Sequence, residues 1–149
     1  MSLNQWADRG WLSRHRATPD EIRNLLRGAE RDLGVCRLPG QPADWVLGIA
    51  HNAALLLASA ALAAEGWRAS GPDHRYRTIA SLAETVGLGD EQVATLQESR
   101  KQRNRAAYET PYLVSEHDAL EIAAAADELR ELVEGWLREN HPELRPAKD

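Results

Sequence analysis

The sequence predicts an all-α protein, folded as an antiparallel bundle of four or five helices. Ala and Leu are abundant, Phe is absent and aromatic residues make up only 5% of the chain, a composition that favours closely packed helices over a β-sandwich. Apolar residues recur at helical spacing in several segments that Gly and Pro separate, and no segment shows a clear strand pattern. A length of 149 residues suits one domain with a single core.

An N-terminal arm precedes the first predicted helix. Residues 1–17 show no clear period, and we expect them to dock loosely or to form a short helical turn. Thr18-Pro19-Asp20-Glu21 has the spacing of a capping box, with Pro at the first helical position. This pattern predicts a helix from about residue 19 to about 34, and Pro and Gly then predict a turn over residues 37–42.

The second predicted helix, residues 43–67, is apolar on nearly all sides. Its main apolar face consists of Trp45, Ile49, Ala53, Leu56, Leu57, Ala60, Ala64 and Trp67. A second apolar strip, on the opposite side, consists of Leu47, Leu55, Ala58 and Leu62. A helix that is apolar all round is buried all round. We therefore expect it to lie at the centre of the bundle or to commit one face to a second subunit. Its longest apolar run, residues 53–64, is too short to span a bilayer.

Three more helices complete the predicted bundle, which we place at residues 18–140. A short helix runs from Asp73 to about Val86, and a fourth runs from Asp90 to the loop that Pro111 marks. Ser115 signals the start of the last helix, from about residue 116 to about 139. The final segment, residues 141–149, contains two prolines, and we expect it to be a flexible tail.

The overall composition narrows the possible functions. A formal net charge of −5 argues against a general nucleic-acid coat protein, but a local RNA site remains possible because the distribution of charge matters more than its sum. Cys36 is the only cysteine, and the five histidines lack metal-binding spacing, so we expect no metal or other cofactor. We see no signal peptide or membrane-spanning segment, which makes a cytoplasmic location the default.

The densest basic cluster ends the fourth predicted helix and reads Arg100-Lys101-Gln102-Arg103-Asn104-Arg105-Ala106-Ala107-Tyr108. On a helical wheel, Arg100, Arg103 and Asn104 continue the apolar stripe that Val93 and Leu96 begin. Guanidinium groups on the buried side of a helix are costly unless a partner or a ligand satisfies them. This conflict between pattern and chemistry predicts a functional site in the cluster.

Three parts of the chain resemble the HEPN superfamily of helical-bundle proteins. The second helix, with the segments Asp44–Leu55 and Ala61–Arg68, resembles a long helix rich in small residues that ends in a Gly-aromatic-Arg turn. The segment His74–Leu82 is similar to one that often begins with a pair of histidines, and Arg100–Glu109 is similar to an arginine-led motif, Arg-Asn followed by His or Tyr. The resemblance covers residues 43–139 and implies an HEPN-like bundle that dimerises through the second and fourth helices.

The resemblance also implies a role in RNA biology. Many HEPN proteins are metal-independent ribonucleases, in which an arginine is followed four to six residues later by a histidine and two copies meet across a dimer. Many bacterial members are encoded beside a minimal nucleotidyltransferase in toxin–antitoxin or abortive-infection pairs. Here Tyr108 stands at the histidine position, and a tyrosine with the usual pKa of about 10 is a poor base at neutral pH. The resemblance therefore implies an RNA-binding or accessory component of a toxin–antitoxin or stress-defence system, with cleavage weak or lost.

Two alternatives stay open. The chain is an active metal-independent endoribonuclease that uses Arg103 with Tyr108 or His51, or it is a scaffold that docks a nucleotidyltransferase and touches no RNA. If the chain binds RNA, with or without cleavage, Arg103 neutralises a phosphate, Asn104 hydrogen-bonds the same group and Tyr108 presents its hydroxyl to the ligand. The structural alternatives are an ion pair of Arg103 at a buried seam and a Tyr108 ring that closes the helix end.

The remaining candidates have auxiliary roles. Arg100, Lys101 and Arg105 would form a rim that binds phosphates, with solvated surface charge as the alternative. His51 is a candidate base if a dimer brings it near Arg103, and its alternative is a buried packing residue. His74 would help to bind an anion or would simply lie on the surface. Asn52, next to His51, is expected to link helices by hydrogen bonds.

Overall fold

The computed structural model describes residues 1–108 and 114–144, and side chains for all of these except residues 105–108. Within this part of the chain there are six α-helices, two short 3-10 turns and one pair of strands. Their bounds are α1 (Leu3–Asp8), β1 (Leu12–Arg14), α2 (Pro19–Cys36), α3 (Ala43–Ala64), β2 (Trp67–Ala69), α4 (His74–Ala80), η1 (Ser81–Ala83), α5 (Asp90–Tyr108), α6 (Glu116–Asn140) and η3 (Pro142–Leu144). The predicted all-α class is confirmed.

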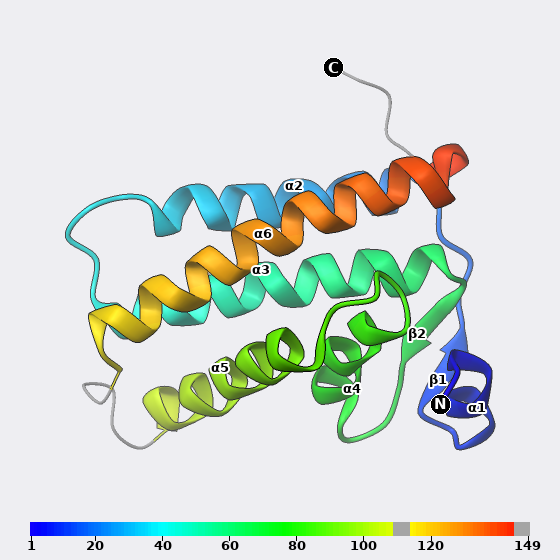
Figure 1. Cartoon of the computed structure of the whole chain (residues 1–149), viewed down its shortest axis with the longest axis horizontal. Helices are drawn as coiled ribbons and strands as arrows, with labels where there is room; N and C mark the ends of the chain where they lie inside the picture. Colours follow the sequence, from blue (N-terminus) through cyan, green and yellow to red (C-terminus); the bar gives the residue numbers. More distant parts are fainter. Residues whose placement is uncertain (109–113, 145–149) are drawn as a thin grey trace.

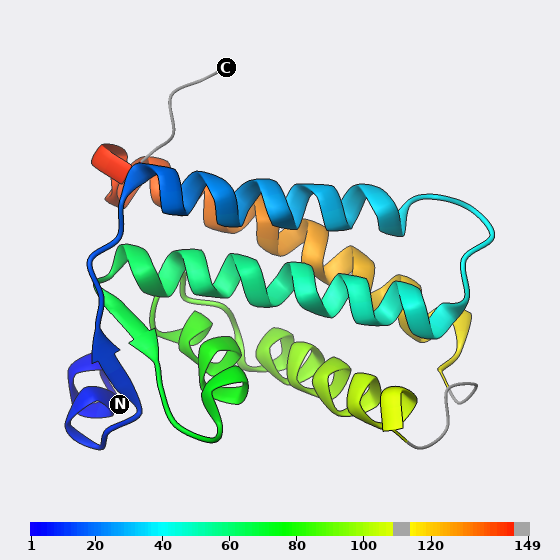
Figure 2. The same cartoon turned by 180° about the vertical axis from the view of Figure 1, so that it is seen from behind.

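Helix α3 lies at the centre of the bundle. It contacts α2 and α6 along one side and α4 and α5 along the other, and α2 and α5 run antiparallel to it (Figures 1 and 2). The side chains of Leu47 and Leu57, which belong to opposite apolar strips, are both fully buried. Most of the predicted burial is therefore met within one chain, although Ile49, Leu55 and Leu56 are only partly buried.

Two tryptophans predicted on the main apolar face of this helix do not belong to its buried surface. Trp45 belongs to the first turn of α3, but 63% of its surface is exposed. Trp67 lies in strand β2, because α3 ends at Ala64 rather than at residue 67. Gly66, with φ +88°, makes the turn between the two elements in a backbone conformation that favours glycine.

Helix α3 also has the length and apolar composition of a membrane-spanning helix, and it is the one helix of the described residues that passes this test. However, 67% of its most apolar window is buried inside the fold. Such burial is typical of the core helix of a soluble protein.

Local capping signals place the starts of two long helices correctly. Thr18 Oγ1 accepts a hydrogen bond of 3.2 Å from the backbone N–H of Glu21 at the start of α2, and Ser115 Oγ accepts one of 3.0 Å from Asp118 at the start of α6. The predicted helix over residues 73–86 is shorter than expected, since α4 ends at Ala80. Hydroxyl groups there bond to backbone carbonyls, which competes with continued α-helix.

The N-terminal arm is ordered against the bundle. The predicted short helical turn is α1, and its Trp6 packs in a buried cluster with Leu12, Leu62 and Trp67. Strand β1 then pairs with β2 in antiparallel fashion, with Ser13 opposite Arg68. Of the two alternatives for residues 1–17, the short helical turn forms, and the arm is firmly rather than loosely docked. The strand pair was not predicted, because three-residue strands are too short to show alternation.

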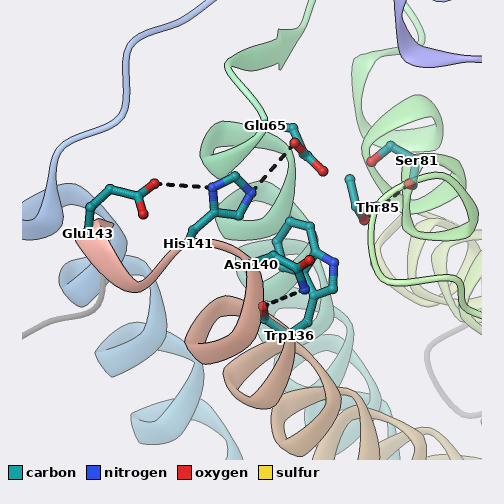
Figure 3. Close-up of polar contacts among 7 residues, drawn as sticks. All are labelled: Glu65, Ser81, Thr85, Trp136, Asn140, His141 and Glu143. Atoms are coloured by element: carbon teal, nitrogen blue, oxygen red, sulfur yellow. Dashed lines mark hydrogen bonds and ion pairs between the residues drawn. The ribbon is translucent and has the colours of Figure 1, made fainter.

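The start of the predicted flexible tail is also docked. His141 Nε2 lies 3.5 Å from a carboxylate oxygen of Glu65 at the end of α3, and its Nδ1 lies 3.4 Å from Glu143 (Figure 3). The imidazole ring also packs on Trp136, with ring centres 5.0 Å apart. These contacts hold residues 141–144 at the end of the bundle, whereas residues 145–149 lie outside the described part of the chain.

Candidate functional site

An open pocket of about 560 Å³ lies where α5 faces α3 and the start of α4. Its lining comes from His51 of α3, from Arg100, Arg103 and Asn104 of α5, and from residues 72–76 at the start of α4. We call this site the basic pocket. The two long helices that form two of its walls are fixed by the buried core, and the segment that leads into α4 supplies the rest of the lining.

Three arginines converge on the basic pocket, and none of them has an acidic partner in the described part of the chain. Among the described residues, no carboxylate forms an ion pair with Arg75, Arg100 or Arg103, although Asp73 lines the same pocket. The Nε of Arg100 is buried and has no hydrogen-bond partner, while its guanidinium lies 5.7 Å from the ring centre of Tyr76. Unpaired guanidinium groups in one concave site favour the binding of an anion.

Gly48 on α3 makes room for Arg103. A Cβ atom added at Gly48 would lie 3.9 Å from Arg103 Nε, so this guanidinium lies directly over the α3 backbone. An alanine would only reach ordinary van der Waals contact, but a larger side chain at this position would displace Arg103. A small residue at this position of α3 therefore leaves room for the Arg103 side chain beside the pocket.

His51 lies at the base of the pocket and is only 2% exposed. Its Nδ1 lies 3.1 Å from Ser99 Oγ, and Ser99 donates its own proton to the carbonyl of Leu96 at 2.5 Å. Ser99 therefore accepts a hydrogen bond from Nδ1–H of His51, which leaves Nε2 as the nitrogen with the free lone pair.

The charge state of His51 follows from its surroundings. Burial, together with the positive charges of Arg103, Arg100 and Arg75, lowers the pKa of His51 to about 4. The imidazole is therefore neutral at pH 7. A neutral imidazole beside guanidinium groups combines a proton acceptor with groups that stabilise an anionic phosphate.

The structure brings most of the predicted site residues to one place. Those that line the basic pocket are His51, His74, Arg100, Arg103 and Asn104. His51 and Arg103 line it within a single chain, so their proximity does not require a dimer. Lys101 is exposed and does not line the pocket, which agrees with its alternative as solvated charge. The side chains of Arg105 and Tyr108 lie outside the described part of the structure.

Sequence reasoning missed Arg75 and Ser99 as parts of the site. Arg75 had a signal, because it lies beside His74 in a basic segment at a helix start. Ser99 had none, since its role depends on a hydrogen bond to a residue 48 positions away. In the described residues, no three His, Cys, Asp or Glu side chains gather in a way that could hold a metal ion.

The chain was compared with models of known protein families. Residues 22–136 match the family model described as the HEPN domain. The matched region runs from the first turn of α2 to the end part of α6 and contains the whole basic pocket. No curated protein and no solved structure matches the chain significantly.

Proposed function

The chain belongs to the HEPN family, and from this membership and the basic pocket we propose that it binds RNA through a phosphate group. The observation that carries the proposal is the convergence of Arg75, Arg100 and Arg103 on one pocket, unpaired by any carboxylate in the described part of the chain. We further propose that it acts in the cytoplasm as a component of a toxin–antitoxin or stress-defence system, with a nucleotidyltransferase as a possible partner.

Charge and geometry support a phosphate ligand. The protein carries a net charge of −5, which as a whole repels anions. The guanidinium groups gathered at one pocket attract an anion locally in spite of this net charge. Guanidinium groups bind phosphate oxygens through short, charge-assisted hydrogen bonds, often two at a time. Phosphate contacts position RNA without reading its sequence, which fits a site in which arginines dominate.

Anisotropy of a labelled single-stranded RNA tests this function. Arg103→Ala removes a charge that lines the pocket, and Lys101→Ala removes a charge two residues earlier on the exposed side of the same helix. A hydrogen bond to a charged group contributes about 1.5–3 kcal/mol, so we expect Arg103→Ala to weaken binding about tenfold or more. Lys101→Ala should change it about twofold at most. Equal losses in both variants would show that binding is diffuse rather than located at the pocket.

A second candidate function is metal-independent RNA cleavage with His51 as the base. The observation that favours it is the Ser99 hydrogen bond, which presents a neutral imidazole in the pocket that Arg103 also lines. If this chemistry operates, RNA cleavage in EDTA is abolished by His51→Asn and by Arg103→Ala, and it survives Tyr108→Phe. Cleavage that depends on Tyr108 instead would assign the base role to the tyrosine. RNA binding without cleavage would leave the first function alone.

We propose that the chain works as a homodimer, with α3 and α5 at the interface. The exposed Trp45 supports this, because it lies three residues before Gly48 and hence on the same side of α3. Arg103 rests on Gly48, so an interface centred on Trp45 would bring two basic pockets near each other. The scaffold hypothesis, in which the chain docks a nucleotidyltransferase alone, expects no RNA binding at any salt concentration and is tested by the same titration.

A further inference from the structure

A second cavity, of about 380 Å³, adjoins the basic pocket. His74, the first residue of α4, lines both of them, so the two spaces are separated by no more than this side chain. The second cavity lies between the strand pair, the start of α2, the end of α3 and α4, elements that lie side by side at one end of the bundle (Figures 1 and 2). We call it the adjoining cavity.

The adjoining cavity has an apolar part and a polar part. Leu25, Leu62 and Ala63 supply apolar surface, and the hydroxyl of Ser59 and the side chains of His15 and Arg68 supply groups that can hydrogen-bond. A cavity of this size, which combines apolar surface with groups that can hydrogen-bond, is suited to a small aromatic or heterocyclic group. The chemistry differs from that of the basic pocket, which arginines dominate.

The N-terminal arm contributes a wall of this cavity. His15 and Glu21 both precede the region that matches the HEPN family. The arm is held in place by the pairing of β1 with β2 and by a hydrogen bond of 2.9 Å from the backbone N–H of His15 to the carbonyl of Gly66. The cavity is therefore completed by an element outside the matched domain.

The acidic group of the cavity wall is already paired. Glu21 lies with its two carboxylate oxygens 2.8 and 2.7 Å from Nε2 of His15. Arg68, by contrast, lies at an exposed strand position and forms no ion pair with any described residue. Arg68 therefore offers the cavity a guanidinium group that no described carboxylate pairs, beside a Glu21 carboxylate that hydrogen-bonds to His15.

We propose that the adjoining cavity holds an unpaired nucleobase of a single-stranded RNA whose phosphate lies in the basic pocket. The inference rests on the proposed RNA binding and adds to it the class of RNA. Single-stranded RNA is recognised by splayed bases that pack on side chains and hydrogen-bond at their edges, which the apolar and polar parts of this cavity allow. A base in a duplex cannot enter, so paired RNA binds through its phosphates alone.

Three ligands of equal length separate the contributions. They are a single-stranded RNA, a ribose-phosphate oligomer without bases and a fully paired duplex, each titrated by anisotropy at one salt concentration. Packing of a base on protein side chains contributes about tenfold in affinity. We therefore expect the single strand to bind about tenfold tighter than the abasic oligomer and the duplex.

Two variants then test the location. Ser59→Leu fills the adjoining cavity and should lower the affinity for the single strand to that for the abasic oligomer, which itself should be unchanged. Arg68→Ala removes an exposed cation of the cavity lining without touching the core, and Arg16→Ala, an exposed arginine that lines neither space, is its control. We expect Arg68→Ala to reduce the preference for the single strand and Arg16→Ala to leave it intact.

The outcomes are distinguishable from failure of RNA binding itself. Equal affinities for the single strand and the abasic oligomer, both weakened by Arg103→Ala, would overturn the base site and leave the phosphate site standing. A preference for the single strand that neither Ser59→Leu nor Arg68→Ala reduces would also overturn it. Binding of none of the three ligands would overturn both proposals. If Ser59→Leu fails to fold, the comparison of Arg68→Ala with Arg16→Ala decides alone.

Discussion

At the scale of single residues, His51 links proton binding to anion binding. Its Nδ1–H is committed to Ser99, and the three arginines and burial disfavour its protonated form. A phosphate in the basic pocket would offset the positive charge of the arginines, which raises the pKa of His51 and makes it a better base. In the proposed cleavage reaction, His51 would thus be neutral in the empty site and a stronger base once the phosphate is bound.

The depressed pKa of His51 predicts a stability that depends on pH. The pKa is lowered from 6.5 to about 4 in the folded chain, so between these values the unfolded chain binds more protons than the folded chain. The contribution of His51 to the free energy of unfolding is then fully present above pH 6.5, and it is lost as the pH drops from 6.5 towards 4. From pH 7 to pH 5 this linkage amounts to about 2 kcal/mol.

Urea unfolding of the native chain and of His51→Asn at both pH values measures this effect. The asparagine amide can still donate to Ser99, but it does not titrate. We expect the native chain to lose about 2 kcal/mol more than the variant on going from pH 7 to pH 5. Parallel losses in both proteins would mean that other groups, and not His51, control the acid sensitivity.

At the scale of secondary-structure elements, the sequence predicts what depends on local contacts. Thr18 and Ser115 each bond to a backbone N–H three residues ahead, and both helix starts were predicted from that spacing. The pairing of Ser13 with Arg68 joins residues 55 positions apart, and no local pattern carries such information. Arg103 and His51 could each be named as candidates from their local sequence. Their shared pocket within one chain could not be predicted, because it depends on contacts between residues far apart in the sequence.

A hydrogen bond between α2 and α3 carries the clearest prediction at this scale. Asn52 Nδ2 donates to Asp32 Oδ2 at 2.7 Å, which confirms the expected cross-link between helices, and Arg31 donates to the other carboxylate oxygen at 3.0 and 3.1 Å. Asp32 is only 8% exposed. Asn52→Ala leaves that buried oxygen unpaired, which should cost about 1–3 kcal/mol of folding stability.

Chemical unfolding of Asn52→Ala beside Asn24→Ala provides the measurement and its control. Asn24 is exposed on α2, and alanine is the better helix former, so this second variant should be neutral or slightly stabilised. A loss of the same size in both variants would indicate a general effect of removing asparagine rather than loss of the link to Asp32.

At the scale of the whole molecule, charge is divided between two regions. The cationic side chains of the basic pocket come from α4 and α5, whereas exposed carboxylates follow α6, where they include Glu121, Glu128, Glu131 and Glu139. An acidic protein with a cationic pocket orients a polyanion towards that pocket as it approaches. Increasing salt should therefore weaken RNA binding in proportion to the few phosphates that the pocket contacts.

The exposed Trp45 predicts that the chain self-associates through the face of α3 that carries it. Most of the two apolar strips of α3 is buried within the chain, but Trp45 at the start of the main strip is not. It is the most exposed of the large hydrophobic side chains that the structure describes. Burying a large apolar side chain contributes about 1.5–3 kcal/mol, and a symmetric interface counts it twice. Trp45→Ser should therefore raise the dimer dissociation constant at least about tenfold.

Sedimentation velocity over a range of protein concentrations measures that shift. Leu132→Ser is the matched control, since Leu132 is also exposed but lies on α6, away from the basic pocket. A native chain that stays monomeric at the concentrations at which it binds RNA would contradict the dimer proposal. If the dimer forms and Trp45→Ser lowers both self-association and RNA affinity, the ligand spans two pockets. If only self-association falls, one pocket binds RNA unaided, because Arg103, Arg100 and His51 already meet within a single chain.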